Sequence, residues 1–132
     1  MQIRRYTWAE FDRAIRILRF TAGVDWANVA AVFGEPRGGM PLAVALSHHR
    51  AVPLVNHSGG RVLWVDDIYD SGSTYRARGK PFYGHHAVWL RREGVDCPIP
   101  FVETVPTGAW AVFPWEDPVR AEKDMREYHA KG

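Results

Sequence analysis

The chain has 132 residues, of which 46% are hydrophobic and 24% charged, so we expect a single folded domain over residues 1–132 rather than a disordered protein. The formal net charge of +2 favours a small anionic ligand over duplex DNA, because there is no dense basic stripe. The sequence has no apolar run of membrane-spanning length and no signal-peptide core, which predicts a cytoplasmic protein that makes no membrane contact.

The first half of the chain predicts alternating helices and strands. Thr7 and Glu10 form a capping box, and apolar residues follow at helical spacing, which predicts an opening amphipathic helix. Residues 29–33 predict a strand, residues 34–39 a glycine-rich loop, and residues 40–49 a helix.

Further strands are predicted at residues 52–55, 62–65 and 87–90. A helix that begins at Ser73 is cut short by Gly79 and Pro81. Four prolines predict an irregular region after the fourth strand: Pro98, Pro100, Pro106 and Pro114. Asp117 and Pro118 then predict the start of a final helix. This alternation predicts an α/β fold with a mainly parallel twisted sheet flanked by helices.

Two loops of this fold carry polar residues suited to a ligand. Residues 34–39 and 66–74 both follow strands, and ligands of parallel sheets bind beyond the carboxyl ends of the strands. Backbone amides and hydroxyl groups make a phosphate cradle of the residues Ser71, Gly72, Ser73 and Thr74. Asp66 and Asp67 would repel phosphate, so they serve sugar hydroxyls or a metal ion. The alternative interpretation is a turn whose acids cap a helix.

The pattern of an apolar strand, Asp66-Asp67, two residues and Asp70-Ser71-Gly72-Ser73-Thr74 resembles the signature of type I phosphoribosyltransferases. These enzymes use 5-phosphoribosyl-1-pyrophosphate (PRPP). Residues 36–39 resemble the pyrophosphate loop of that family, in which a cis peptide bond occurs. Within the family the chain is most similar to xanthine-guanine phosphoribosyltransferases, through residues 7–8, 37–39, 110 and 114–116.

The resemblance implies a role for each residue of these motifs. Asp66 and Asp67 would hold the ribose hydroxyls and, indirectly through PRPP or water, a Mg²⁺ ion. The 5-phosphate would be enclosed by the residues Asp70, Ser71, Gly72, Ser73 and Thr74. Arg37 and Gly38 would meet the pyrophosphate. Trp110 would stack on the purine base, and Arg91 or Arg92 would contact its exocyclic oxygen.

The implied reaction moves the 5-phosphoribosyl group from PRPP to a purine base, with guanine, xanthine or hypoxanthine as the expected acceptor. Pyrophosphate leaves and a nucleoside monophosphate forms. Arg37 and Asp70 would be the catalytic residues: Arg37 stabilises negative charge on the leaving group, and Asp70 accepts or orients a proton of the base. We expect a homo-oligomer, either a dimer or a larger assembly.

One region departs from the family. Family members carry a long flexible loop between the second and third strands that closes over the reacting centre, whereas this chain has only residues 57–60 there. A missing loop predicts slow transfer, loss of PRPP to hydrolysis, or a loop supplied by another subunit. The alternative function is therefore a non-catalytic PRPP- or nucleotide-binding regulator on the same fold, which would contact RNA as some family members do.

Overall fold

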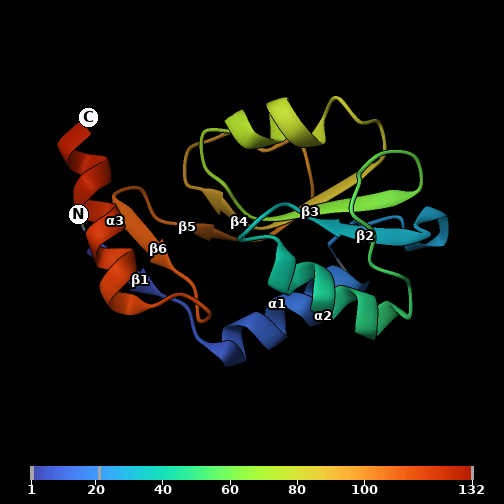
Figure 1. Cartoon of the computed structure of the whole chain (residues 1–132), viewed down its shortest axis with the longest axis horizontal. Coiled ribbons are helices and arrows are strands. Elements are labelled where there is room, and N and C mark those ends of the chain that lie inside the picture. The colour runs from blue at the N-terminus through green and yellow to red at the C-terminus, as the bar shows by residue number, and fades with distance from the viewer. Residues whose placement is uncertain (1, 21, 132) are drawn as a thin grey trace.

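A computed structural model describes residues 2–20 and 22–131, and its largest feature is a four-stranded parallel sheet. The strands are β2 (Ala31–Gly34), β3 (Val62–Tyr69), β4 (His85–Arg92) and β5 (Phe101–Val105), and they lie in the order β2-β3-β4-β5. All of their pairings are parallel, which confirms the predicted sheet type. Figure 1 shows this sheet beside a smaller group formed by the two ends of the chain.

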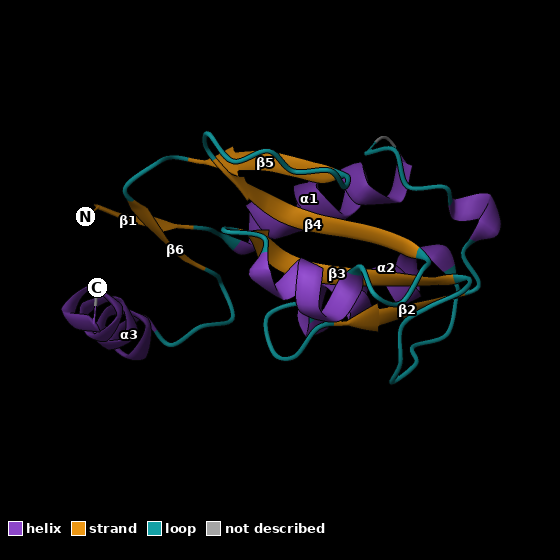
Figure 2. Ribbon diagram, turned by 90° about the horizontal axis from the view of Figure 1, so that it is seen from above, coloured by secondary structure: helices purple, strands orange, loops and turns teal. Residues whose placement is uncertain are grey.

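Helices cover both faces of the four-stranded sheet. α1 (Trp8–Phe20) and α2 (Met40–Arg50) lie on one face, and a short π-helical turn, Tyr75–Gly79, lies on the other (Figures 1 and 2). The predicted capping box opens α1, since the Glu10 amide donates to Thr7 Oγ1 at 3.1 Å and the Thr7 amide donates to Glu10 Oε1 at 3.0 Å. A 3₁₀ turn, Trp26–Asn28, precedes β2.

The second sheet pairs β1 (Gln2–Arg5) with β6 (Ala109–Val112) in parallel. The two strands are far apart in the sequence, one near each end of the chain. α3 (Pro118–Lys131) follows and lies beside this pair, away from the larger sheet (Figure 2). The Val119 amide donates to Asp117 Oδ1 at 3.1 Å, which confirms the predicted start of the last helix. We refer to β1, β6 and α3 together as the terminal unit.

Three predicted elements differ from the structure. Residues 52–55 form only an isolated bridge, Val32 to Leu54, because Pro53 has no amide hydrogen with which to continue a ladder. β3 continues to Tyr69 instead of ending at Val65, because its pairing with β4 runs on through Asp66. The proline-rich stretch is not irregular: its prolines lie outside β5 and β6, so they bound the two strands without interrupting them.

The apolar core lies between the larger sheet and the helices α1 and α2. Its fully buried side chains come from both layers, for example Ile15, Leu18, Leu42, Leu63, Val65 and Trp89. The core thereby fixes β3, the strand whose end carries the acidic motif. None of the helices in the described ranges has the length and apolar character that a membrane span requires.

Candidate active site

The acidic pair lies in the second half of β3, where the strand is still paired with β4, and not in a loop. Asp66 lies opposite Val88 of β4 and is buried, with 8% of its surface exposed. The Asp67 amide donates to Asp66 Oδ1 at 2.8 Å. The two carboxyl groups lie close enough to interact with each other. Asp67 lines all three of the cavities described below.

Burial changes the protonation of this pair. Loss of hydration, together with the neighbouring Asp67 carboxylate, raises the pKa of Asp66 to about 9. Burial also raises the pKa of Asp67 above its ordinary value. In the free protein at neutral pH, Asp66 is therefore protonated, and only a ligand that supplies hydrogen bonds or positive charge makes two carboxylates favourable here.

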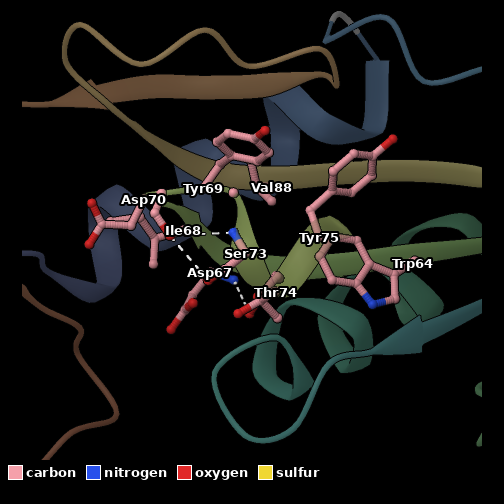
Figure 3. Close-up of a pocket in the computed structure, with 12 residues that line it drawn as sticks. Trp64, Asp67, Ile68, Tyr69, Asp70, Ser73, Thr74, Tyr75 and Val88 are labelled. Atoms are coloured by element: carbon pink, nitrogen blue, oxygen red, sulfur yellow. Dashed lines mark hydrogen bonds between the residues drawn. The ribbon is translucent and has the colours of Figure 1, made fainter. Parts of the chain in front are cut away.

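The loop after β3 forms a small cavity of about 140 Å³, which we name the phosphate cavity after the ligand that the sequence predicts for it. The Ser73 amide and the Ser71 hydroxyl are tied together, since the amide donates to Ser71 Oγ at 3.3 Å and that hydroxyl donates to Ser73 Oγ at 3.1 Å. Gly72 has φ +85°, and a Cβ there would collide with the Tyr69 hydroxyl and with Arg76. In Figure 3, Asp67 and Asp70 lie on one side of this cavity, and Trp64 and Tyr75 lie on the other.

The glycine-rich loop after β2 lies against the acidic pair. The peptide bond between Pro36 and Arg37 is cis, as the resemblance implies. A Cβ on Gly38 would overlap the Asp67 carboxylate, and a Cβ on Gly39 would overlap the Val65 carbonyl oxygen. Arg37, Gly38 and Asp67 line a second, wider cavity of about 490 Å³, the loop cavity.

A third cavity of about 200 Å³, the aromatic cavity, contains the predicted base-stacking residue. Trp110 lines it together with Asp70 and Arg92. Arg92 Nε donates to Asp70 Oδ1 at 2.9 Å, and Arg92 Nη1 donates to the carbonyl oxygens of Pro106 and Ala109 at 2.8 and 2.6 Å. These bonds orient both charged side chains at one edge of the cavity.

Of the two alternatives Arg91 and Arg92, the structure brings Arg92 to the site. Arg91 points to the opposite face of β4, where its guanidinium donates to the Val95 carbonyl oxygen and to the Thr104 hydroxyl. The same group also lies over the Phe101 ring. Strand alternation explains the difference, since neighbouring side chains on β4 leave opposite faces of the sheet.

The three cavities adjoin one another. The phosphate and aromatic cavities share Asp67, Ile68 and Asp70, and the loop and aromatic cavities share Asp67 together with side chains that follow β6. The structure thus brings together every predicted site residue except Arg91 around the end of β3. This arrangement offers one extended ligand hydrogen-bond donors suited to a phosphate, a cation at a glycine-rich loop and an aromatic surface.

Two site residues were absent from the set proposed from the sequence. Glu116 and Asp124 line both the loop cavity and the aromatic cavity. Burial, with the nearby Asp67 and Asp124 carboxylates adding to it, raises the pKa of Glu116. The predicted helix start at Asp117 indicated that Asp124 would lie on a helix. The sequence did not indicate that this helix, α3, lies beside the end of β3.

The connection between residues 55 and 62 is short and leads directly into the start of β3. The Gly60 amide donates to the Tyr83 carbonyl oxygen at 2.6 Å, which ties the connection to the segment before β4. Beside it is a cavity of about 470 Å³ lined by Glu35, His57 and Arg78, where Arg78 Nε lies 2.5 Å from Glu35 Oε2. The described residues of this connection form no flap above the end of β3.

Solved structures with the same architecture were found, although no protein-family model and no curated protein matches the chain. A purine phosphoribosyltransferase from Pyrococcus horikoshii is 25% identical, with 89% of this chain and 95% of that chain covered and a TM-score of 0.69. The xanthine-guanine-hypoxanthine phosphoribosyltransferase of Helicobacter pylori is 21% identical (93% and 99% covered, TM-score 0.66). A hypothetical protein from Neisseria gonorrhoeae with bound ppGpp is 19% identical (100% and 99% covered, TM-score 0.67). The chain has the fold of the type I phosphoribosyltransferases, and the resemblance found in the sequence is confirmed.

Proposed function

We propose that this protein is a phosphoribosyltransferase that moves the 5-phosphoribosyl group from PRPP to a purine base. The observation that carries the proposal is the meeting of three cavities at Asp67. Their chemistry corresponds to the three parts of the reacting pair: a hydroxyl- and amide-rich cavity for the 5-phosphate, a loop with Arg37 for pyrophosphate, and an aromatic cavity for the base.

The residues act on the sugar from two sides. Asp66 and Asp67 bind the ribose hydroxyls and hold C1 between the leaving group and the base. Arg37 neutralises charge on the departing pyrophosphate while C1 becomes electron-poor. The purine nitrogen adds from the opposite side, and Asp70, oriented by Arg92, accepts or orients its proton.

The donor set fits Mg²⁺, because the side chains that point toward the sugar are carboxylates and Mg²⁺ prefers oxygen ligands. Among the described residues, no three His, Cys, Asp or Glu side chains are placed to hold a metal ion by themselves. Asp66 and Asp67 would hold the ion through PRPP oxygens or water. When bound, it would supply further positive charge for the leaving pyrophosphate.

The test is an incubation with magnesium, PRPP and each of guanine, xanthine, hypoxanthine and adenine, with monophosphate and pyrophosphate measured separately. We expect a nucleoside monophosphate with a 6-oxopurine. Pyrophosphate should exceed nucleotide, because the short connection before β3 leaves the electron-poor C1 open to water. A ratio near one at ordinary enzyme rates would contradict the open site and indicate a flap from a second subunit or from residues 76–80.

The short connection also favours a second candidate, a PRPP- or nucleotide-binding regulator that does not turn over. Such a regulator would bind its ligand at the phosphate cavity and would not need to exclude water from the sugar. PRPP binding without any nucleotide product would support this candidate and contradict the enzyme. RNA is a partner only under this alternative, and assembly into a homo-oligomer is proposed under both.

A further inference from the structure

The aromatic cavity has a cation at one edge and carboxylates at another. Arg92 and Asp70 are joined by the 2.9 Å bond and therefore lie together. Glu116 and Asp124 also line the loop cavity with Arg37, so they lie at the edge nearer the sugar and pyrophosphate. A planar base against Trp110 would thus meet a donor at one edge and acceptors at the other.

Each of these groups keeps unused hydrogen-bonding capacity. The bonds of Arg92 use Nε and Nη1, and no bond joins Nη2 to another described residue. Glu116 Oε1 accepts from the Phe113 amide at 2.9 Å, and Asp124 Oδ1 accepts from Arg120 Nε at 3.2 Å. The second oxygen of each carboxylate has no such bond within the described residues, and both side chains are held in place by the first.

The pattern matches one 6-oxopurine better than the others. Guanine presents an oxygen at C6 to Arg92 and an amino group at C2 to the carboxylates. Hypoxanthine has no group at C2. Xanthine presents an oxygen at C2 and readily loses a proton near neutral pH, so the carboxylates repel it. Adenine presents an amino group to Arg92, donor against donor.

We propose that Asp124 of α3, together with Glu116, makes the site select guanine over xanthine and hypoxanthine. This inference rests on the proposed function, and it identifies which of its purines the site accepts. Glu116 and Asp124 are partly buried in the free protein, and a base that covers them removes water from their oxygens. An analogue without the C2 amino group then leaves these acceptors unpaired.

The experiment measures binding of GMP, IMP and XMP by calorimetry, without PRPP. The proteins compared are the parent, the single variants Asp124→Asn and Glu116→Gln, and the variant that carries both substitutions. We expect the parent to bind GMP at least about tenfold more tightly than XMP, and the two substitutions together to bring the ratio below about threefold. Glu122→Gln is the matched control: Glu122 lies on the same helix, 3.7 Å from Arg126, and lines neither cavity.

Equal affinity for GMP and XMP in the parent would overturn the proposal, and so would an unchanged ratio in the doubly substituted protein. Binding of none of the three nucleotides would instead contradict the proposed function itself. A variant that fails to fold is recognised by its circular dichroism, and Glu116→Gln alone then provides the comparison.

Discussion

The larger sheet and the terminal unit hold the two halves of the same site in different ways. Residues 66–74 continue a strand whose side chains Leu63 and Val65 are fully buried between two layers. In α3 only Ala121 is buried among the residues whose burial is described, and Tyr128 is 62% exposed. The proposed sugar–phosphate half thus rests on the core, whereas the proposed base half depends in part on a lightly packed helix, α3.

Under the proposed function, this difference separates the contacts to PRPP from the contacts to the base. PRPP is the same for every enzyme of this type, so its contacts are placed on strands that the core fixes. The base differs, and its contacts Trp110, Glu116 and Asp124 come from β6, the following turn and α3. Substitutions in the terminal unit are therefore expected to change base preference without unfolding the protein.

The largest expected effect tests the packing contrast itself, by one truncation made in each region. Val32→Ala removes two methyl groups from a side chain with no exposure in β2, and we expect the free energy of unfolding to fall by about 2–3 kcal/mol. Val119→Ala makes the same change in α3, where Val119 is 76% exposed, and should cost below about 0.5 kcal/mol. Urea unfolding measures both, and equal costs would contradict the contrast.

The second prediction concerns the phosphate cavity. Gly72→Ala places a Cβ at φ +85°, against the Tyr69 hydroxyl and Arg76, so the loop must move and PRPP affinity should fall at least about thirtyfold. Gly94→Ala is the control, because Gly94 has φ +81° but open space around it. Calorimetry that finds both variants equal to the parent would show that residues 71–74 do not hold the phosphate.

The residues of the proposed sugar–phosphate half could be named from the sequence because they are contiguous. Asp66 to Thr74 form one strand-to-loop segment, and a single motif carries both their identity and their geometry. The base half depends on contacts between distant segments. Nothing local indicated that Gln2–Arg5 would pair with Ala109–Val112, and the prolines near β5 and β6 were interpreted as breaks when they are boundaries.

The third prediction uses the raised pKa of Asp66. The folded chain keeps a proton on Asp66 up to about pH 9, whereas the unfolded chain releases it near pH 4, so the folded state binds more protons between these values. Stability conferred by the protonated form is thus complete at low pH and is lost as pH rises. In the parent we expect the unfolding free energy to fall from pH 7 to pH 8.

Asp66→Asn removes this dependence while keeping the size of the side chain. The variant should lose about 1–2 kcal/mol less than the parent over the same interval, measured by urea unfolding at both pH values. Taking the difference between the two proteins cancels the contribution of other groups that titrate in this interval. The variant should bind PRPP poorly at both pH values, and an identical pH slope in both proteins would contradict the assignment.

The fourth prediction turns to the base half. If Trp110 lies against the purine, GMP quenches tryptophan emission, and Trp110→Leu should abolish most of that quench and weaken GMP by about five- to tenfold, since stacking is worth on the order of 1 kcal/mol. Trp26→Leu is the control, because Trp26 donates to the Leu18 carbonyl oxygen and lines none of the three cavities. A quench that survives in Trp110→Leu would move the base elsewhere.

The smallest expected effect tests whether the terminal unit positions Trp110. The Tyr128 ring lies 5.4 Å from the Trp110 ring at 48°, yet Tyr128 is not among the residues that line the aromatic cavity. It therefore supports the indole from a side that the cavity does not use. Because Tyr128 is largely exposed, Tyr128→Leu should change unfolding free energy by less than about 0.5 kcal/mol.

The same substitution should weaken GMP about two- to threefold, because the indole gains freedom that base binding must then remove. PRPP affinity should stay unchanged, since the phosphate cavity rests on β3 and not on α3. Tyr83→Leu is the control, as Tyr83 is 89% exposed and lines none of the three cavities. Equal GMP affinity in Tyr128→Leu and the parent would mean that β6 alone holds Trp110, and the base half would then be as firmly built as the sugar half.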